Sequence, residues 1–247
     1  DAATYDAKVD PNLAVDLVNE AISAGARGIA ISVPDQAIGP AVARAAADAG
    51  VVLVATDDAI RDADGNPVPL VGFDDEEMGR QVGETAARIL VDEGWLDDST
   101  RKVGVLSVEV PILPACNDRT DASKAAIRAA GVPDARVLSV LSTGETSSAR
   151  DATGPVVTAN PDITDWVVVG CSDDGVLGAL EMLATAGVGS ASIIAVGLGA
   201  HEACRPWAAG EASGFRAALF VSGFDVGRTA ATLLHEAVVD GAVPPAM

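Results

Sequence analysis

Residues 46–58 read AADAGVVLVATDD, and this stretch decides the fold class. The Ala-Gly step at its centre is typical of a helix end, because Gly50 can take the left-handed conformation that closes a helix. The run 51–56 is continuously apolar up to its last residue, as expected of a strand covered on both faces of a sheet. It leads directly into Asp57 and Asp58. The order of helix, buried strand and acidic pair predicts a unit of parallel sheet with polar groups at the carboxyl end of its strand.

The same order returns three times along the chain. It appears as ISAGARGIAIS (22–32), IRAAGVPDARVLSV (127–140) and LATAGVGSASIIAV (183–196). We therefore predict an α/β protein built from βαβ units. The predicted helix-closing glycines are Gly25, Gly50, Gly131 and Gly187.

The predicted strands form two groups, which indicates two doubly wound lobes. Asp10 before Pro11 and Asp74 before an apolar stripe are typical helix starts. A last strand (215–221) and helix (about 224–240) could return the chain to the first lobe. That lobe has few strands, and the chain stops at VPPAM, so we expect segments to be missing at both ends. The two groups of strands are 28–32, 51–56 and 68–73, and then 103–108, 136–141, 166–171 and 193–198.

Composition excludes several classes of function. The 247 residues carry a net charge of −20, which disfavours binding to nucleic acid or to an anionic membrane surface. The apolar runs are too short to span a bilayer. The three cysteines, Cys116, Cys171 and Cys204, are odd in number and form no CxxC, so we expect neither a disulfide framework nor a metal site from them. No signal peptide is visible.

Polar and small residues follow most of the predicted strands. Carboxyl ends of parallel strands meet at one edge of a sheet, where ligands bind. Arg119 follows the strand 103–108 after a loop. The candidate ligand-binding residues are Ser32, Asp57, Asp58, Phe73, Arg119, Cys171, Ser172, Gly199 and Glu202.

Three kinds of chemistry could use the acidic pair: an acid/base dyad, a metal site, or hydrogen bonds to a polyhydroxyl ligand. Adjacent residues at a strand end diverge, which disfavours the dyad. The stretch DADGNP (62–67) predicts a turn, not a calcium loop, and GLGAHE (197–202) is a weak match to a dinucleotide motif. Carboxylates, an arginine and an aromatic ring suit sugar hydroxyls and the apolar sugar face.

Four of the candidates also have a purely structural explanation, whereas Asp57 at a strand end is harder to explain in that way. Asp58 could cap a following helix, and Ser172 could cap the helix after it. Arg119 could lie on a helix surface, and Phe73 could belong to the core.

Four segments resemble the type I periplasmic sugar-binding proteins, and within them the L-arabinose-binding branch. They are AISVPDQAIGPAVARAAADAGVVLVATDDAIRDADGNPV (30–68), GFDDEEMGRQVGE (72–84), WVVVGCSDDGVLGALEMLATAG (166–187) and IIAVGLGAHEA (193–203). The resemblance covers nearly the whole chain. It implies an α/β fold of two doubly wound parallel-sheet lobes with a ligand cleft between them. The implied lobes are 1–73 plus 222–247 and 74–221.

The resemblance also implies roles for individual residues. Asp57 and Asp58 would accept hydrogen bonds from sugar hydroxyls, and Arg119 would lie near the ring oxygen. Phe73 stands where the branch has Met. Ser172 and Gly199 stand where it has Asn, which disfavours L-arabinose and favours another pentose, a hexose or a polyol.

The implied function is that of the solute-binding receptor of an ABC-type carbohydrate importer, with no catalysis, cofactor or metal. Its partners would be a monosaccharide or polyol and the membrane permease. The location would be periplasmic or extracellular, with a signal peptide upstream. The alternative is the sugar-sensing effector domain of a LacI-type transcriptional regulator, with a helix-turn-helix upstream.

Overall fold

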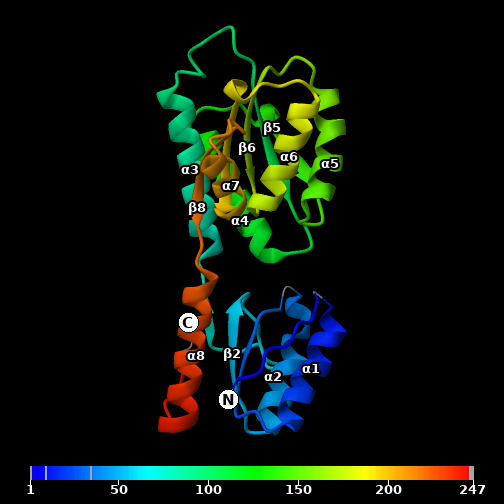
Figure 1. Ribbon diagram of the computed structural model, residues 1–247, viewed down its shortest axis with the longest axis vertical. Coiled ribbons are helices and arrows are strands. Elements are labelled where there is room, and N and C mark those ends of the chain that lie inside the picture. Colours follow the sequence, from blue (N-terminus) through cyan, green and yellow to red (C-terminus); the bar gives the residue numbers. More distant parts are fainter. Residues whose placement is uncertain (1, 9, 34, 245–247) are drawn as a thin grey trace. The chain divides into compact units, whose positions relative to one another are not determined.

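The computed structural model describes residues 2–8, 10–33 and 35–244, so the last three residues of the VPPAM stretch lie outside it. The chain divides into two compact units, Asp1–Phe73 with Ser222–Met247, and Asp74–Val221. Figure 1 draws both in the colours of the sequence. Among the described residues, no helix has the length and apolar character needed to cross a bilayer.

The smaller unit contains a three-stranded parallel sheet in the order β1-β2-β3. Helix α8 packs on one face of this sheet, and α1 and α2 lie on the other (Figure 1). The elements of this unit are α1 (Pro11–Ser23), β1 (Gly28–Ile31), η1 (Gln36–Ile38), α2 (Gly39–Asp48), β2 (Val52–Asp57), β3 (Leu70–Gly72) and α8 (Gly223–Asp240).

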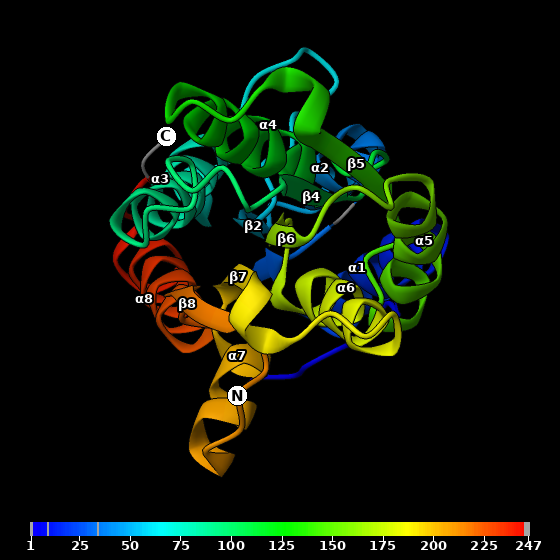
Figure 2. The same ribbon diagram turned by 90° about the horizontal axis from the view of Figure 1, so that it is seen from above.

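The larger unit contains a five-stranded parallel sheet in the order β5-β4-β6-β7-β8. Helices α3 and α4 cover one face, and α5, α6 and α7 cover the other, as Figures 1 and 2 show. Its elements are α3 (Asp75–Asp92), β4 (Val103–Glu109), α4 (Pro114–Ala129), η2 (Asp134–Arg136), β5 (Val137–Leu141), α5 (Thr146–Ala159), β6 (Asp165–Gly170), α6 (Asp173–Thr185), η3 (Ser190–Ser192), β7 (Ile193–Gly199), α7 (His201–Ala209) and β8 (Phe215–Phe220). The predicted α/β class with parallel sheets is confirmed.

The predicted helix boundaries are also confirmed. The side chain of Asp10 accepts hydrogen bonds from the backbone N–H groups of Asn12 and Leu13, and Pro11 is the first helical residue of α1. Asp74 caps α3 by accepting from the N–H of Glu77. The four predicted helix-closing glycines all have positive φ, between 66° and 106°. These local signals need only short-range geometry, which explains why the sequence shows them.

The strand order reverses between β4 and β6. From β4 the chain crosses to β5 at one edge, then returns across β4 to β6 and continues to β8. The helices that follow β4 and β6 therefore lie on opposite faces. The carboxyl ends of these two strands are thus the topological switch point, called the crevice below, at which open parallel sheets bind ligands. Every residue of β6 is buried, so the crevice rests on the centre of the core.

Helices α3 and α4 approach each other more closely than ordinary side chains allow. A Cβ added at Gly79 would lie 2.0 Å from the carbonyl oxygen of Arg119, and one at Gly83 would lie 2.5 Å from that of Ser123. The hydroxyl of Ser123 lies 2.7 Å from the carbonyl oxygen of Gly79 and donates to it. The two glycines therefore set the distance between α3 and the helix that carries Arg119.

We predict that Gly79→Ala lowers the free energy of unfolding by about 1–3 kcal/mol, the usual cost of overpacking. Gly227 in α8 is the matched control, because nothing lies within 4 Å of a Cβ added there. Gly227→Ala should leave stability unchanged or raise it by up to about 1 kcal/mol, through helix propensity. Urea unfolding followed by circular dichroism measures both. Equal stability changes in the two variants would refute the close-packing argument.

Candidate functional site

A disulfide joins the two sides of the crevice between β4 and β6. Cys116 is the third residue of α4, and Cys171 comes directly after β6. Both are buried, next to Val110 and Leu113. The expectation of no disulfide is therefore wrong. The odd number of cysteines consists of one bonded pair and one free thiol, Cys204, which is exposed.

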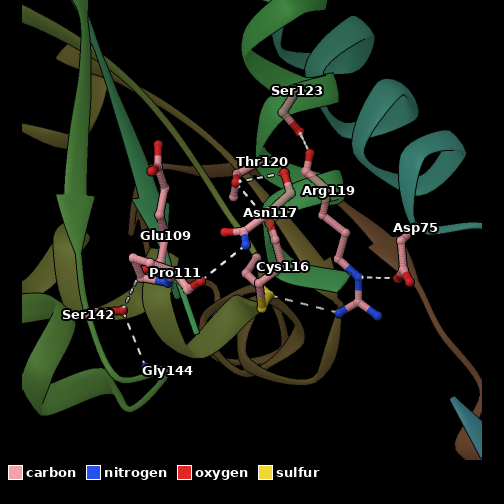
Figure 3. The surroundings of a disulfide bond; sticks show 11 residues. Asp75, Glu109, Pro111, Cys116, Asn117, Arg119, Thr120, Ser123, Ser142 and Gly144 are labelled. Atoms are coloured by element: carbon pink, nitrogen blue, oxygen red, sulfur yellow. Dashed lines mark hydrogen bonds and ion pairs between the residues drawn. A yellow bond between two sulfur atoms is a disulfide. The ribbon is translucent and has the colours of Figure 1, made fainter. Parts of the chain in front are cut away.

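Arg119 lies one turn of α4 beyond Cys116 and is held on two sides (Figure 3). Its Nε donates to Oδ1 of Asp75 at 2.7 Å, and its Nη1 lies 4.0 Å from Sγ of Cys171. The side chains of Arg119 and Asp75 are only 14% and 19% exposed. Arg119 is thus not a surface residue, and its guanidinium group is fixed at the crevice.

A second ion pair anchors α4 to the end of β4. The ammonium group of Lys124 donates to Oε1 of Glu109 at 2.8 Å and lies 2.9 Å from Oδ1 of Asp121. Burial alone would lower the pKa of Lys124, but the hydrogen bonds to Glu109 and Asp121 outweigh it and raise the pKa. Glu109 also accepts from the hydroxyl of Ser139 in β5, so α4, β4 and β5 share one anchor.

Ser172 and Asp173 begin α6 next to the disulfide. Ser172 is the N-cap residue by backbone conformation, yet in the described part of the chain its hydroxyl makes no capping bond. Asp173 is fully buried, and its Oδ2 accepts from the backbone N–H groups of Glu202 and Ala203 at 3.0 and 3.1 Å. A Cβ added at Gly197 would lie only 2.0 Å from Oδ1 of Asp173. This Oδ1 has no hydrogen-bond partner among the described residues. Asp173 therefore ties the start of α7 to the start of α6.

The carboxyl end of β7 has an unusual backbone. Gly199 has φ +117°, and Ala200 has φ +68°, which is rare for a residue with a β-carbon. Strained residues of this kind cluster at ligand sites. Glu202 follows on α7, is buried, and accepts from Nη1 of Arg205 at 2.9 Å.

Asp174, His201 and Glu202 form a small group of potential metal ligands, whose ligand atoms lie within 4.8 Å of one another. Protein groups already contact these side chains. Nε2 of His201 lies 3.4 Å from Oδ2 of Asp174, and Glu202 pairs with Arg205. These contacts account for the close approach of the three side chains.

The smaller unit carries the remaining candidates at the carboxyl edge of its own sheet. Ser32 follows β1 and is exposed, and Phe73 follows β3 and is half-buried. Asp57 ends β2, is exposed, and has φ +67°. Because β1, β2 and β3 are parallel neighbours, these residues share one edge. Asp57 also lies opposite Gly72 in the register of β2 and β3.

The proposed capping role of Asp58 is wrong, because no helix lies in the described segment 58–69. This segment forms the predicted turn instead. Asp62 accepts hydrogen bonds from the side chain and backbone of Asn66, which lower the pKa of Asp62, and Gly65 takes positive φ. Asp58 is half-buried just before this turn.

The sequence did not predict the roles of three residues that position the candidates. Asp75 holds Arg119, Cys116 bonds to Cys171, and Asp173 caps the start of α7. Asp75 and Asp173 were visible only as acidic residues at helix starts. Their partners lie 44 and 29 or 30 residues away along the chain. The packing of α3 against α4 and the order of the strands bring them together.

Two units, each with polar side chains at the carboxyl edge of a parallel sheet, define a class of proteins that bind small polar molecules. The chain belongs to the family described as periplasmic binding protein domain, whose model matches residues 1–242.

Curated relatives and solved structures agree with this membership. The chain is 31% identical to an ABC transporter L-arabinose-binding periplasmic protein of Azospirillum brasilense, over 91% of this chain and 68% of that protein. It is 26% identical to the L-arabinose-binding periplasmic protein of Escherichia coli (strain K12), over 96% of this chain and 72% of that protein. The Caulobacter myo-inositol binding protein bound to myo-inositol shares the fold, with a TM-score of 0.81 at 22% identity, over 99% of this chain and 79% of that one.

We predict that Asp173→Ala lowers the free energy of unfolding by about 1–3 kcal/mol, because two buried N–H groups at the start of α7 lose their acceptor. Asp174→Ala is the control, since Asp174 is adjacent and, among the described residues, pairs with the exposed side chain of His201 alone. Its effect should stay within about 0.5 kcal/mol. Chemical denaturation of both variants measures the difference. A loss no larger in Asp173→Ala than in Asp174→Ala would contradict the capping role.

Proposed function

We propose that the chain is the solute-binding receptor of an ABC-type importer and binds a monosaccharide or polyol without chemical conversion. Family membership supports this, because the relatives described above are solute-binding proteins and the curated ones are named as ABC-transporter or periplasmic proteins. In this proposal each unit supplies part of the binding surface, and the units close on the ligand. The partner is then the membrane permease.

The observation that carries the proposal is the chemistry at the two carboxyl edges. The smaller unit presents the carboxylates of Asp57 and Asp58, and the larger unit presents the fixed guanidinium group of Arg119. Carboxylates accept hydrogen bonds from hydroxyls, and arginine donates to hydroxyl or ring oxygens. Phe73 offers a ring face for the apolar side of a sugar.

The ligand in this proposal differs from L-arabinose. Ser172 has a hydroxyl that is not used in capping α6, and Gly199 has no side chain. Both stand where the resembling branch has Asn. A sugar hydroxyl left without a partner costs about 1–3 kcal/mol. A ligand with a different arrangement of hydroxyls is therefore favoured.

The disulfide supports the proposed compartment. Bonds such as Cys116–Cys171 persist outside the reducing cytosol. This supports a periplasmic or extracellular location, and it disfavours the LacI-type effector domain, which works in the cytosol. The relatives described above give that alternative no support.

We predict that a thermal-shift screen finds a ligand among D-ribose, D-allose, D-fucose, glycerol and myo-inositol, and that L-arabinose, screened as the comparison, gives a smaller shift. A ligand at 100 times its Kd stabilises the folded state by about 2.7 kcal/mol, which shifts Tm by several degrees. No shift with any of these compounds would count against the receptor function.

Asp57→Ala should then weaken binding of the best compound by about 2 kcal/mol or more, because hydroxyl donors lose their acceptor. Asp64→Ala is the matched control, an exposed carboxylate in the turn of the same unit. Isothermal titration calorimetry compares the two. Unchanged affinity in Asp57→Ala would remove Asp57 from the site.

A further inference from the structure

The disulfide lies at the reversal of the strand order in the larger unit. Cys116 stands in the first turn of α4, on the β4 side, and Cys171 stands on the β6 side. The two cysteines are 4% and 5% exposed. The bond therefore spans the crevice where an open parallel sheet binds ligands, and is not a staple on the outer surface.

The same bond fixes the position of Arg119. Residues three apart on a helix share a face, so Arg119 lies above Cys116 on the crevice side of α4. Its Nη1 contacts Sγ of Cys171, while its Nε donates to Asp75 on α3 (Figure 3). The guanidinium group thus lies between the carboxylate of Asp75 and the disulfide.

The bond also fixes Ser172, which follows Cys171 directly. Ser172 has the backbone conformation of a cap, but its hydroxyl takes no part in capping in the described structure. One covalent link therefore holds two candidate ligand groups from opposite sides of the crevice. Groups held in their bound positions before binding lose less entropy when the ligand arrives.

We propose that the Cys116–Cys171 disulfide is a positioning element of the binding site, and that its reduction weakens ligand affinity. This inference rests on the proposed function. A dithiol such as dithiothreitol supplies two electrons: the Sγ–Sγ bond breaks, Cys116 and Cys171 become thiols, and the reductant becomes a cyclic disulfide. Affinity then depends on the oxidation state of this pair.

The first experiment measures Kd by calorimetry for the best compound of the sugar and polyol screen, with oxidised and reduced protein. Reduction should weaken affinity about tenfold, the effect of losing one well-placed hydrogen bond to a charged group. The variant Cys116→Ser with Cys171→Ser should match the reduced protein and not respond to dithiothreitol. Cys204→Ser is the matched control, because it removes a thiol and keeps the disulfide. Unchanged affinity in the double variant overturns the proposal.

A second comparison separates positioning from general stability. In the double variant Arg119→Ala with Ser172→Ala both positioned groups are absent, so reduction should weaken affinity much less than in the wild type. Measurements are made well below the Tm of each form. An equal loss in the wild type and in this double variant means that the disulfide only stabilises the fold, which overturns the positioning role.

Hydrogen exchange tests the inference even if no compound binds the oxidised protein. The absence of any binding would refute the proposed function, and hydrogen exchange would then test whether the disulfide holds the two segments in place. On reduction, amides of residues 114–119 and 171–174 should exchange faster, while those of α5 and β5 stay protected. Equal protection of residues 114–119 and 171–174 in both states would show that the disulfide does not hold these segments.

Discussion

The parallel pairing of β4 with β6 is the constraint on which the larger unit depends. These strands are neighbours in the sheet, with Val103 opposite Asp165, although β5 and α5 lie between them in sequence. The chain leaves β4 toward one face and β6 toward the other, so their ends cannot be filled by a shared helix. Arg119, Cys171 and Ser172 lie at the carboxyl ends of these two strands, and the fully buried strand β6 supports Cys171 and Ser172 from the centre of the core.

Close backbone approaches keep this opening in shape. Gly79 and Gly83 let α3 pack against the backbone of Arg119 and Ser123. Asp75 at the start of α3 can therefore pair with Arg119 on α4. Gly197 likewise leaves room for the buried carboxylate of Asp173, which caps α7. Each glycine removes a β-carbon where an interhelical or cap contact replaces it. Glycines behind the carboxyl edge therefore determine where the side chains of Asp75 and Asp173 lie.

Local features of the fold could be predicted from the sequence, and long-range pairings could not. Asp10, Asp74 and the helix-closing glycines act within one turn of chain, so their signals were readable. The positions of Asp57 and Ser172 at strand ends followed from strand and turn patterns alone. The partner of Cys171 depends on β6 lying beside β4, which no local pattern encodes. The alternative that Asp58 caps a helix fails because the turn closed by Asp62 and Asn66 takes the place of that helix.

Gly199, at the end of β7, leaves room for the imidazole ring of His201. A Cβ at Gly199 would lie 2.9 Å from Nδ1 of His201, so the imidazole ring already occupies the space that a side chain would need. In the tautomer in which Nε2 donates to Asp174, Nδ1 is a hydrogen-bond acceptor beside the strand end. A larger residue at position 199 would therefore crowd this ring, and the positive-φ backbone of Gly199 and Ala200 leads directly into His201.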